Sequence, residues 1–467
     1  MIAPARMAAF RALRAVIQRS VALPDSLYSV RTDVPDRRDR ALLNEIVTGT
    51  LRWLNALDYL IVHFADRPLL KLDPVVRDVL RISIYQLLHL DRVPPSAVVN
   101  DAVNITRTEG PNRAAGLTNA VLRALLRALP HLPSPDEPQE SELAAVSEVQ
   151  FSDWPTDLRQ RALQFISISH SHPDWLVERW LTRYGYSATL AWTKFNNEPA
   201  SLTLRANTLH TTSAALVSRF RENAIVAEPL RYGPDGLSIA SGNHFLPDLT
   251  SSRDFFVQAE ASQLIPPLVQ AEPGMTILDA CAAPGGKALA LASAMANQGT
   301  LVAGDFSQAR LNLLAHTVTR LGASVVKPVA HDLSRNTPFG TIFDRVLVDV
   351  PCSGLGTVQR DPDIRWRRQL NDIQRMADRQ IKMLRVAATT VRSGGRLVYA
   401  TCSGEPEENE RVVENFLGSE TKFHAEDLRT LDESSNFGSI LNEVGHLRSY
   451  PHLHRLDAFF AASFKRT

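Results

Sequence analysis

Two of the three cysteines in this chain follow apolar runs of the kind that forms buried strands. Cys352 belongs to the segment Asp-Val-Pro-Cys-Ser-Gly at 349–354, and Cys402 belongs to Thr-Cys-Ser at 401–403. A free cysteine is usually an inert, buried apolar residue, and we expect this of Cys281. In an open α/β sheet, however, ligands bind at the carboxyl ends of the strands. The sequence therefore predicts that Cys352 and Cys402 lie at one functional edge.

A loop with two glycines follows the first strand of the same region. It reads Asp-Ala-Cys-Ala-Ala-Pro-Gly-Gly-Lys at 279–287, and Asp305 lies 20 residues beyond Gly285. Glycines let a ligand approach a helix N-terminus, and a carboxylate placed like Asp305 can accept hydrogen bonds from ribose hydroxyls. The spacing alone leaves a plain strand–helix turn equally open. The loop matches neither Gly-x-Gly-x-x-Gly nor Gly-x-x-x-x-Gly-Lys-Ser/Thr, which disfavours a dinucleotide oxidoreductase and favours an adenosyl ligand without a phosphate chain. Asp332, after the third strand, is either a partner of the adenine amino group or a solvated loop residue.

Two thiols, a carboxylate and an adenosyl pocket fit one reaction, the methylation of a pyrimidine at C5. This carbon is a poor nucleophile, but addition of a thiolate to C6 gives an enamine whose C5 accepts a methyl group from a sulfonium. A carboxylic acid near N3 stabilises the developing charge, and the base has to leave its stack. Residue types and spacing do not choose between Cys352 and Cys402 as the nucleophile. No second cysteine pair has metal-binding spacing, so we expect no metal site.

The elements that hold these loops belong to the last of three predicted parts. Residues 256–467 alternate short apolar runs with helical patterns, which is typical of a doubly wound α/β sheet. Residues 145–255 combine strand-like runs with one helical stretch and predict a small α+β module. Residues 1–130, including their Arg-rich start, read as helices of a compact bundle, and the Pro-rich residues 131–144 read as a linker. The predicted strands of the last part are 277–279, 301–303, 325–326, 346–349 and 397–400.

Composition places the chain among globular proteins of a reducing compartment. It has 467 residues, 44% of them hydrophobic, with 51 Lys and Arg against 50 Asp and Glu, which excludes a disordered chain or a disulfide scaffold. The presence of only three cysteines favours the cytosol. The chain has no apolar stretch of about 18 residues, so we expect no membrane-spanning segment. The net charge near zero is an average over parts of the chain that differ in charge, because residues 1–130 carry 18 basic and 12 acidic residues. This excess of positive charge belongs either to an ordinary solvated surface or to a surface that binds a polyanion.

With these motifs the sequence resembles the RNA cytosine-C5 methyltransferases, most closely the bacterial small-subunit (16S) rRNA enzymes with a NusB-like helical N-terminal domain. The family's adenosylmethionine loop is similar to 279–287, its Pro-Cys-Ser-Gly loop to 351–354, and its Thr-Cys-Ser loop to 401–403, which Pro-Glu-Glu-Asn follows at 406–409. The resemblance implies an all-α NusB-like bundle, a small α+β module and a C-terminal α/β, Rossmann-like class I methyltransferase domain. It extends over nearly the whole chain through 85–87, 119–123, 172–176, 204–207 and 257–262.

The resemblance also implies a role for each site residue. Cys402 would be the nucleophile that adds to C6, and Cys352 would assist release of the product through proton abstraction and elimination. Asp349 would hold the cytosine at N3, and Lys287 would assist at the base. S-adenosylmethionine would be held by Cys281, Ala282, Ala283, Pro284, Gly285, Gly286, Lys287, Asp305, Asp332 and Asp349.

The implied function is methylation of C5 of one unpaired or flipped-out cytosine in 16S rRNA by a cytoplasmic monomer that acts on neither DNA nor membranes. The same chemistry on tRNA is the nearest alternative, because a NusB-like domain favours rRNA without excluding tRNA. A non-catalytic RNA-binding assembly factor is disfavoured by the intact Cys352, Cys402, Asp349 and Lys287. An exocyclic-amine methyltransferase would carry Asn/Asp-Pro-Pro-aromatic where this chain has Asp-Val-Pro-Cys.

Overall fold

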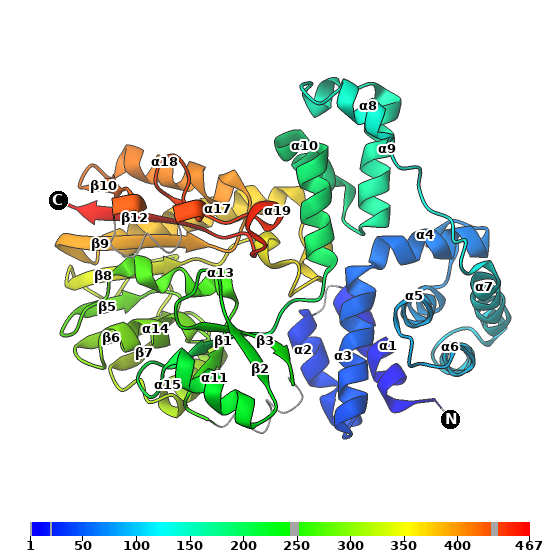
Figure 1. The fold of residues 1–467 in the computed structure, drawn as a ribbon, viewed down its shortest axis with the longest axis horizontal. Coiled ribbons are helices and arrows are strands. Elements are labelled where there is room, and N and C mark those ends of the chain that lie inside the picture. Colours follow the sequence, from blue (N-terminus) through cyan, green and yellow to red (C-terminus); the bar gives the residue numbers. More distant parts are fainter. Residues whose placement is uncertain (1, 19–20, 243–251, 431–437) are drawn as a thin grey trace. The chain divides into compact units, whose positions relative to one another are not determined.

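The computed structural model of the chain describes residues 2–18, 21–242, 252–430 and 438–467. The chain forms two compact units (Figure 1). Unit 1 consists of Met1–Glu198 and Val358–Arg368, and unit 2 consists of Pro199–Thr357 and Gln369–Thr467. The sequence places finer module boundaries after 130, 144 and 255, and these stay predictions.

Seven helices of unit 1 surround one apolar core that includes Phe10, Ile46, Leu80 and Leu122. Asp73 caps the fifth helix, because its side chain accepts a hydrogen bond from the backbone N–H of Val75 in the first turn. The seven helices are α1 (Pro4–Ile17), α2 (Leu23–Ser29), α3 (Arg37–Arg52), α4 (Leu54–Ala65), α5 (Pro74–His89), α6 (Pro95–Glu109) and α7 (Ala115–Ala128).

The rest of unit 1 contains a second, smaller core around Trp154, Leu158 and Leu181. Three α-helices joined by turns and short helical segments make up residues 140–197, and the strands of the predicted mixed module begin at Thr203. Apolar residues at helical spacing, such as Leu176, Val177 and Trp180, are all buried on one face of a long helix. The helices are α8 (Glu140–Ala145), α9 (Thr156–Gln164) and α10 (Asp174–Asn197).

A short segment from the C-terminal half of the sequence completes unit 1. We call Val358–Arg368 the inserted segment; it contains helix α16 (Ile364–Arg367). Trp366 packs against the seven-helix core, and its indole N–H donates to the carbonyl oxygen of Leu51 at 2.6 Å. The Arg365 side chain is fully buried and donates to the carbonyl oxygen of Ser171 at 2.8 Å. The segment begins six residues after Cys352 in the sequence.

Unit 2 opens with a small antiparallel sheet, as the sequence predicted. Its strands are ordered β2-β3-β1-β4, and one helix covers the face that buries Leu204 and Phe255. The elements are β1 (Thr203–Ala206), α11 (Ser213–Glu222), β2 (Val226–Pro229), β3 (Gly236–Ser241) and β4 (Phe255–Val257).

The large sheet of unit 2 is mixed. The five predicted strands are confirmed and run parallel in the order β7-β6-β5-β8-β9, and an antiparallel edge that the sequence analysis did not predict continues through β12 and β10, with β11 beside β12. The strand order reverses between β6 and β8 on the two sides of β5, which is where ligands bind in such sheets. The strands are β5 (Thr276–Asp279), β6 (Thr300–Asp305), β7 (Val326–Ala330), β8 (Phe343–Asp349), β9 (Val391–Thr401), β10 (Phe423–Glu426), β11 (Leu447–Arg448) and β12 (Phe460–Arg466).

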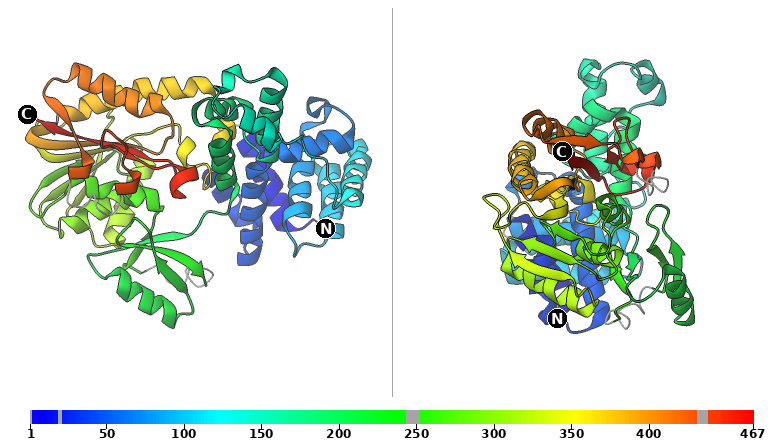
Figure 2. Two further views of the ribbon diagram at one scale, coloured as in Figure 1. Left: turned by 45° about the horizontal axis from the view of Figure 1, so that its top comes forward. Right: turned by 90° about the vertical axis from the view of Figure 1, so that its left-hand side faces the viewer.

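Helices cover both faces of this sheet (Figure 2). Ile277 packs with the layer of α14 and α15, and its neighbour Leu278 packs with the layer of α17 and α18, as expected for alternate side chains of a central strand. No helix in the described part of the chain is long and apolar enough to cross a membrane. The helices of this part are α13 (Glu260–Gln263), α14 (Gly286–Ala294), α15 (Gln308–Arg320), α17 (Leu370–Ala388), α18 (Glu410–Ser419) and α19 (Pro451–His454).

Candidate active site

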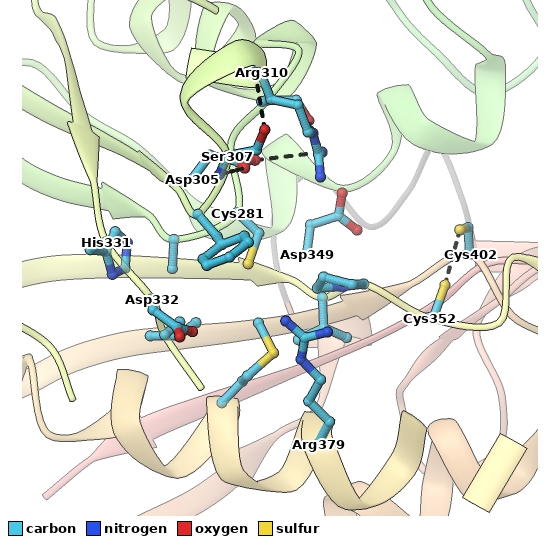
Figure 3. A pocket seen from close by; sticks show the side chains of 17 residues that line it. Cys281, Asp305, Ser307, Arg310, His331, Asp332, Asp349, Cys352, Arg379 and Cys402 are labelled. Atoms are coloured by element: carbon cyan, nitrogen blue, oxygen red, sulfur yellow. Dashed lines mark hydrogen bonds and ion pairs between the residues drawn. The ribbon is translucent and has the colours of Figure 1, made fainter. Parts of the chain in front are cut away.

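A cavity of about 400 Å³ lies at the carboxyl edge of the large sheet (Figure 3). This volume is in the range of small-molecule sites. The structure brings seven of the predicted site residues to its walls, whereas the predicted residues Ala282, Pro284, Gly285, Gly286 and Lys287 do not line it. The seven are Cys281, Ala283, Asp305, Asp332, Asp349, Cys352 and Cys402.

The loop after β5 has no room for side chains at its two glycines. Gly285 has a φ of 111°, and a Cβ there would lie 2.8 Å from Cδ1 of Leu314. A Cβ on Gly286 would lie 2.6 Å from Cε1 of Phe256. The loop therefore enters α14 between two packed side chains, in a backbone conformation that favours glycine.

Carboxylates follow the second and third parallel strands. Asp305, at the end of β6, accepts the backbone N–H of Ser307 at 3.0 Å and lies 3.5 Å from the guanidinium of Arg310. Arg310 also donates to the carbonyl oxygen of Ala283 at 2.7 Å and so ties the 279–287 loop to α15. Asp332, after β7, accepts the hydroxyl of Ser334 at 2.6 Å. Asp305 and Asp332 thus reach the cavity in fixed orientations, as Figure 3 shows.

A buried charge cluster stands beside the cavity. Nζ of Lys287 lies 2.7 Å from Oδ2 of Asp349. Burial lowers the pKa of Lys287, but the Asp349 carboxylate outweighs burial and the net pKa is raised, so the ammonium persists. Burial, followed by repulsion from Asp349, raises the pKa of Asp279 to about 7, while Lys287 opposes the rise. Lys287 acts on the cavity through Asp349 instead of lining it.

The two loop cysteines meet, with 3.1 Å between Sγ of Cys352 and Sγ of Cys402. The hydrogen bond to Cys402, and then burial, raise the pKa of Cys352 well above its ordinary value. Cys352 therefore keeps its proton at neutral pH, and the two sulfurs share one hydrogen bond. Lys287 is near enough to interact electrostatically with Cys402. Burial raises the pKa of Cys281 as well, so this thiol is also protonated.

Two arginines at the cavity were absent from the sequence analysis. Arg310 lies in the first turn of α15, five residues after Asp305, so its place beside a strand end was open to prediction. Arg379 projects from the middle of α17, and only the packing of that helix brings it to the cavity. Within the described ranges, no three His, Cys, Asp or Glu residues are grouped as they would be around a metal ion.

Two solved structures share this architecture. The crystal structure of PH0851 matches with a TM-score of 0.77 and 25% identity, covering 100% of both chains. The structure of a methyltransferase homolog protein from Pyrococcus horikoshii matches with a TM-score of 0.55 and 26% identity, covering 66% of this chain and 99% of its own. The fold and the site therefore define a methyltransferase.

Family models and relatives give a finer assignment. A model described as 16S rRNA methyltransferase RsmB/F matches residues 267–465, the NusB family matches 3–127, and an RsmF/B-like ferredoxin-like domain matches 172–245. The "Probable ribosomal RNA small subunit methyltransferase B" of Synechocystis sp. is 32% identical over 99% of both chains. The ribosomal RNA small subunit methyltransferase B of Pseudomonas putida is 33% identical over 88% of both.

This chain belongs to the RsmB/F family of ribosomal RNA small-subunit methyltransferases. The expected NusB-like helical domain, small sheet module and C-terminal methyltransferase domain are confirmed.

Proposed function

We propose that this protein transfers a methyl group from S-adenosylmethionine to C5 of a cytosine in 16S rRNA, through a transient covalent bond between Cys402 and C6. The observation that carries this proposal is the pair of thiols 3.1 Å apart at the cavity that Asp349 also lines. Thiol addition at C6 needs one sulfur, and removal of the C5 proton needs a second group close to the first.

The cavity residues fit an adenosyl ligand. S-adenosylmethionine would supply a methyl group on a sulfonium. Asp305 would accept hydrogen bonds from the ribose hydroxyls, since Ser307 and Arg310 already orient its carboxylate. Asp332 would accept the adenine amino group, and the loop 281–286 would contact the ligand through Cys281 and Ala283, which line the cavity.

Asp349 and Lys287 would bind the target base. The carboxyl group of Asp349 would hold the cytosine at N3, where negative charge develops as C6 is attacked. The ammonium of Lys287, 2.7 Å from this carboxylate, would supply the proton that N3 gains. A proton held in a low-dielectric site next to the developing charge stabilises the transition state strongly.

The two thiols would act in sequence. The sulfur of Cys402 bonds to C6, the ring electrons move to C5, and C5 takes the methyl group. Bonding of Cys402 to C6 removes the hydrogen bond that contributes most to the raised pKa of Cys352. Cys352 then loses its proton to solvent and removes the C5 proton, the C5–C6 double bond re-forms, N3 returns its proton to the amine of Lys287, and Cys402 leaves as a thiolate.

Single substitutions of the two cysteines test this order. Cys402→Ala should abolish methyl transfer and form no adduct, while still binding S-adenosylmethionine. Cys352→Ala should accumulate a covalent protein–RNA complex, visible as a shifted band on a denaturing gel. Turnover by Cys402→Ala, or absence of the band with Cys352→Ala, would contradict the proposed roles.

Bisulfite sequencing identifies the substrate. We expect one cytosine of 16S rRNA to resist conversion only when the protein is present. Protection in tRNA instead would replace the proposed substrate. The NusB match and the surplus of 18 basic over 12 acidic residues in 1–130 support RNA contact by unit 1.

A further inference from the structure

Each of the two loop cysteines is followed by a serine whose side chain is fully buried. The hydroxyls of Ser353 and Ser403 both donate to Oε2 of Glu408, at 2.5 Å and 2.6 Å. The backbone N–H of Ser353 donates to the other oxygen, Oε1, at 2.7 Å. One carboxylate therefore joins the residues next to both sulfurs.

We propose that Glu408 is a positioning residue that holds the Cys352 and Cys402 sulfurs at reacting distance. This inference rests on the proposed roles of the two cysteines. It assigns to Glu408 no contact with RNA or with the methyl donor.

The spacing of the strands shows why such a bridge is needed. Cys352 follows β8 and Cys402 follows β9, which are neighbouring parallel strands in register at Asp349 and Ala400. Neighbouring strands lie about 4.8 Å apart. Beyond their ends the two loops share a backbone hydrogen bond from the N–H of Gly356 to the carbonyl oxygen of Cys402, at 3.1 Å. The sulfurs are 3.1 Å apart, so the two loops have to be drawn towards each other beyond the sheet.

Glu408 is itself fixed from several directions. It ends the short helix η9 (Pro406–Glu408), and its backbone carbonyl accepts the hydroxyl of Tyr399 at 2.6 Å. Nε2 of Gln380, on α17, donates to Oε1 at 2.9 Å. Four donors thus satisfy a side chain that is fully buried. A carboxylate suits this place because both of its oxygens only accept hydrogen bonds.

The same carboxylate acts on the chemistry of the nearer thiol. Glu408 is one of the charges that raise the pKa of Cys352, after the hydrogen bond to Cys402 and burial. Removal of its charge should therefore lower the pH at which Cys352 loses its proton. A residue with a purely structural role would leave this pH unchanged.

Glu408→Gln is the test. Glutamine keeps the shape of the side chain, but it replaces one carboxylate oxygen by an N–H₂ group, which cannot accept hydrogen bonds from the two donors that face it. Phenylarsine oxide is the probe for sulfur spacing: its arsenic binds two adjacent thiols and releases one water, and intact mass spectrometry reports the complex. We expect the variant to bind the arsenical at least about tenfold more weakly, a loss of about 1.4 kcal/mol. The exposed Glu414→Gln on α18 is the matched control and should bind like the wild type.

Kinetics supply the second measurement. With Glu408→Gln we expect kcat to fall at least about 30-fold with little change in KM for RNA, because misplaced reacting groups slow the chemical steps. The pH at which activity changes because Cys352 loses its proton should be lower in this variant than in the wild type. Wild-type arsenical affinity together with wild-type kcat in a folded Glu408→Gln protein would overturn the proposal.

Two further variants keep the test decisive if Glu408→Gln does not fold. Ser353→Ala and Ser403→Ala each remove one donor and keep the charge, and each should weaken arsenical binding in the same direction. Unchanged binding in both would also overturn the bridge. If Cys402→Ala retained turnover, the proposed reaction would fail, yet the arsenical measurement would still report whether Glu408 sets the sulfur spacing.

Discussion

Replacement of Asp279 by asparagine should stabilise unit 2 in neutral and alkaline solution. Asp279 is fully buried at the end of β5, and its pKa rises from 3.8 to about 7 on folding, mainly through burial. The folded state therefore binds this proton more tightly than the unfolded state. The wild type has its full stability below pH 4 and loses part of it as the pH rises towards 7. Since a tenfold change in proton affinity corresponds to about 1.4 kcal/mol, the total loss is about 4 kcal/mol.

The asparagine side chain has a similar shape and no charge to bury. The stability of Asp279→Asn relative to the wild type should therefore rise by about 4 kcal/mol between pH 4 and pH 8. It should rise at about 1.4 kcal/mol per pH unit up to about pH 7, because in this range the unfolded carboxyl is ionised while the folded one is still protonated. Urea unfolding at several pH values, followed by far-ultraviolet circular dichroism, measures this difference. Tryptophan fluorescence identifies the transition of unit 1, because that unit contains all six tryptophans: Trp53, Trp154, Trp175, Trp180, Trp192 and Trp366.

A matched control separates this effect from general electrostatics. Asp427 is an exposed carboxylate of unit 2 whose pKa is lowered by its hydrogen bond to Arg429. Because its pKa lies below 4, Asp427→Asn should leave the dependence between pH 5 and pH 8 as in the wild type. The reasoning fails if the stability difference between Asp279→Asn and the wild type is the same at every pH, or if it shrinks as the pH rises.

Two further substitutions probe the walls of the cavity. Lys287→Met should reduce methyl transfer at least about 100-fold, because it removes the ammonium 2.7 Å from Asp349 that would supply the proton to N3; radiolabelled methyl incorporation measures the rate, and full activity would contradict the proton supply proposed for this lysine. Gly285→Ala should destabilise unit 2 by about 1–3 kcal/mol and weaken S-adenosylmethionine binding in calorimetry, because the new methyl group meets Leu314 at a positive φ. Gly418→Ala, where a Cβ meets nothing within 4 Å, is its control and should leave binding unchanged.

Local chemistry in the sequence was sufficient to predict most elements. Asp73 followed by proline marks the start of α5, since an acceptor side chain and a fixed φ both favour that point. The apolar runs at 277–279 and 346–349 became central strands because they are buried on both faces. Strand ends share one edge of a parallel sheet, so Asp305, Asp349 and the loop cysteines could be expected near one another before any coordinates.

Features that depend on packing between distant segments were beyond prediction from local patterns. The antiparallel strand β12 (Phe460–Arg466) is defined by its pairing with β9, some 60 residues earlier, and not by a signal of its own. The place of Arg379 at the cavity follows from the packing of α17 on strands β8 and β9. The joint contact of Ser353 and Ser403 with Glu408 likewise requires that β8 and β9 be neighbours.

The inserted segment determines when the helical unit can finish folding during synthesis. Residues 1–198 leave the ribosome first, but the partner of the Ser171 carbonyl is Arg365, made almost 200 residues later. Domains usually fold in the order in which they are translated. Here the first unit has to wait, incompletely packed, while residues 199–357 emerge. The nascent chain therefore acquires its two units nearly together, and a ribosome stalled before residue 358 would display a helical bundle that still lacks Trp366 in its core.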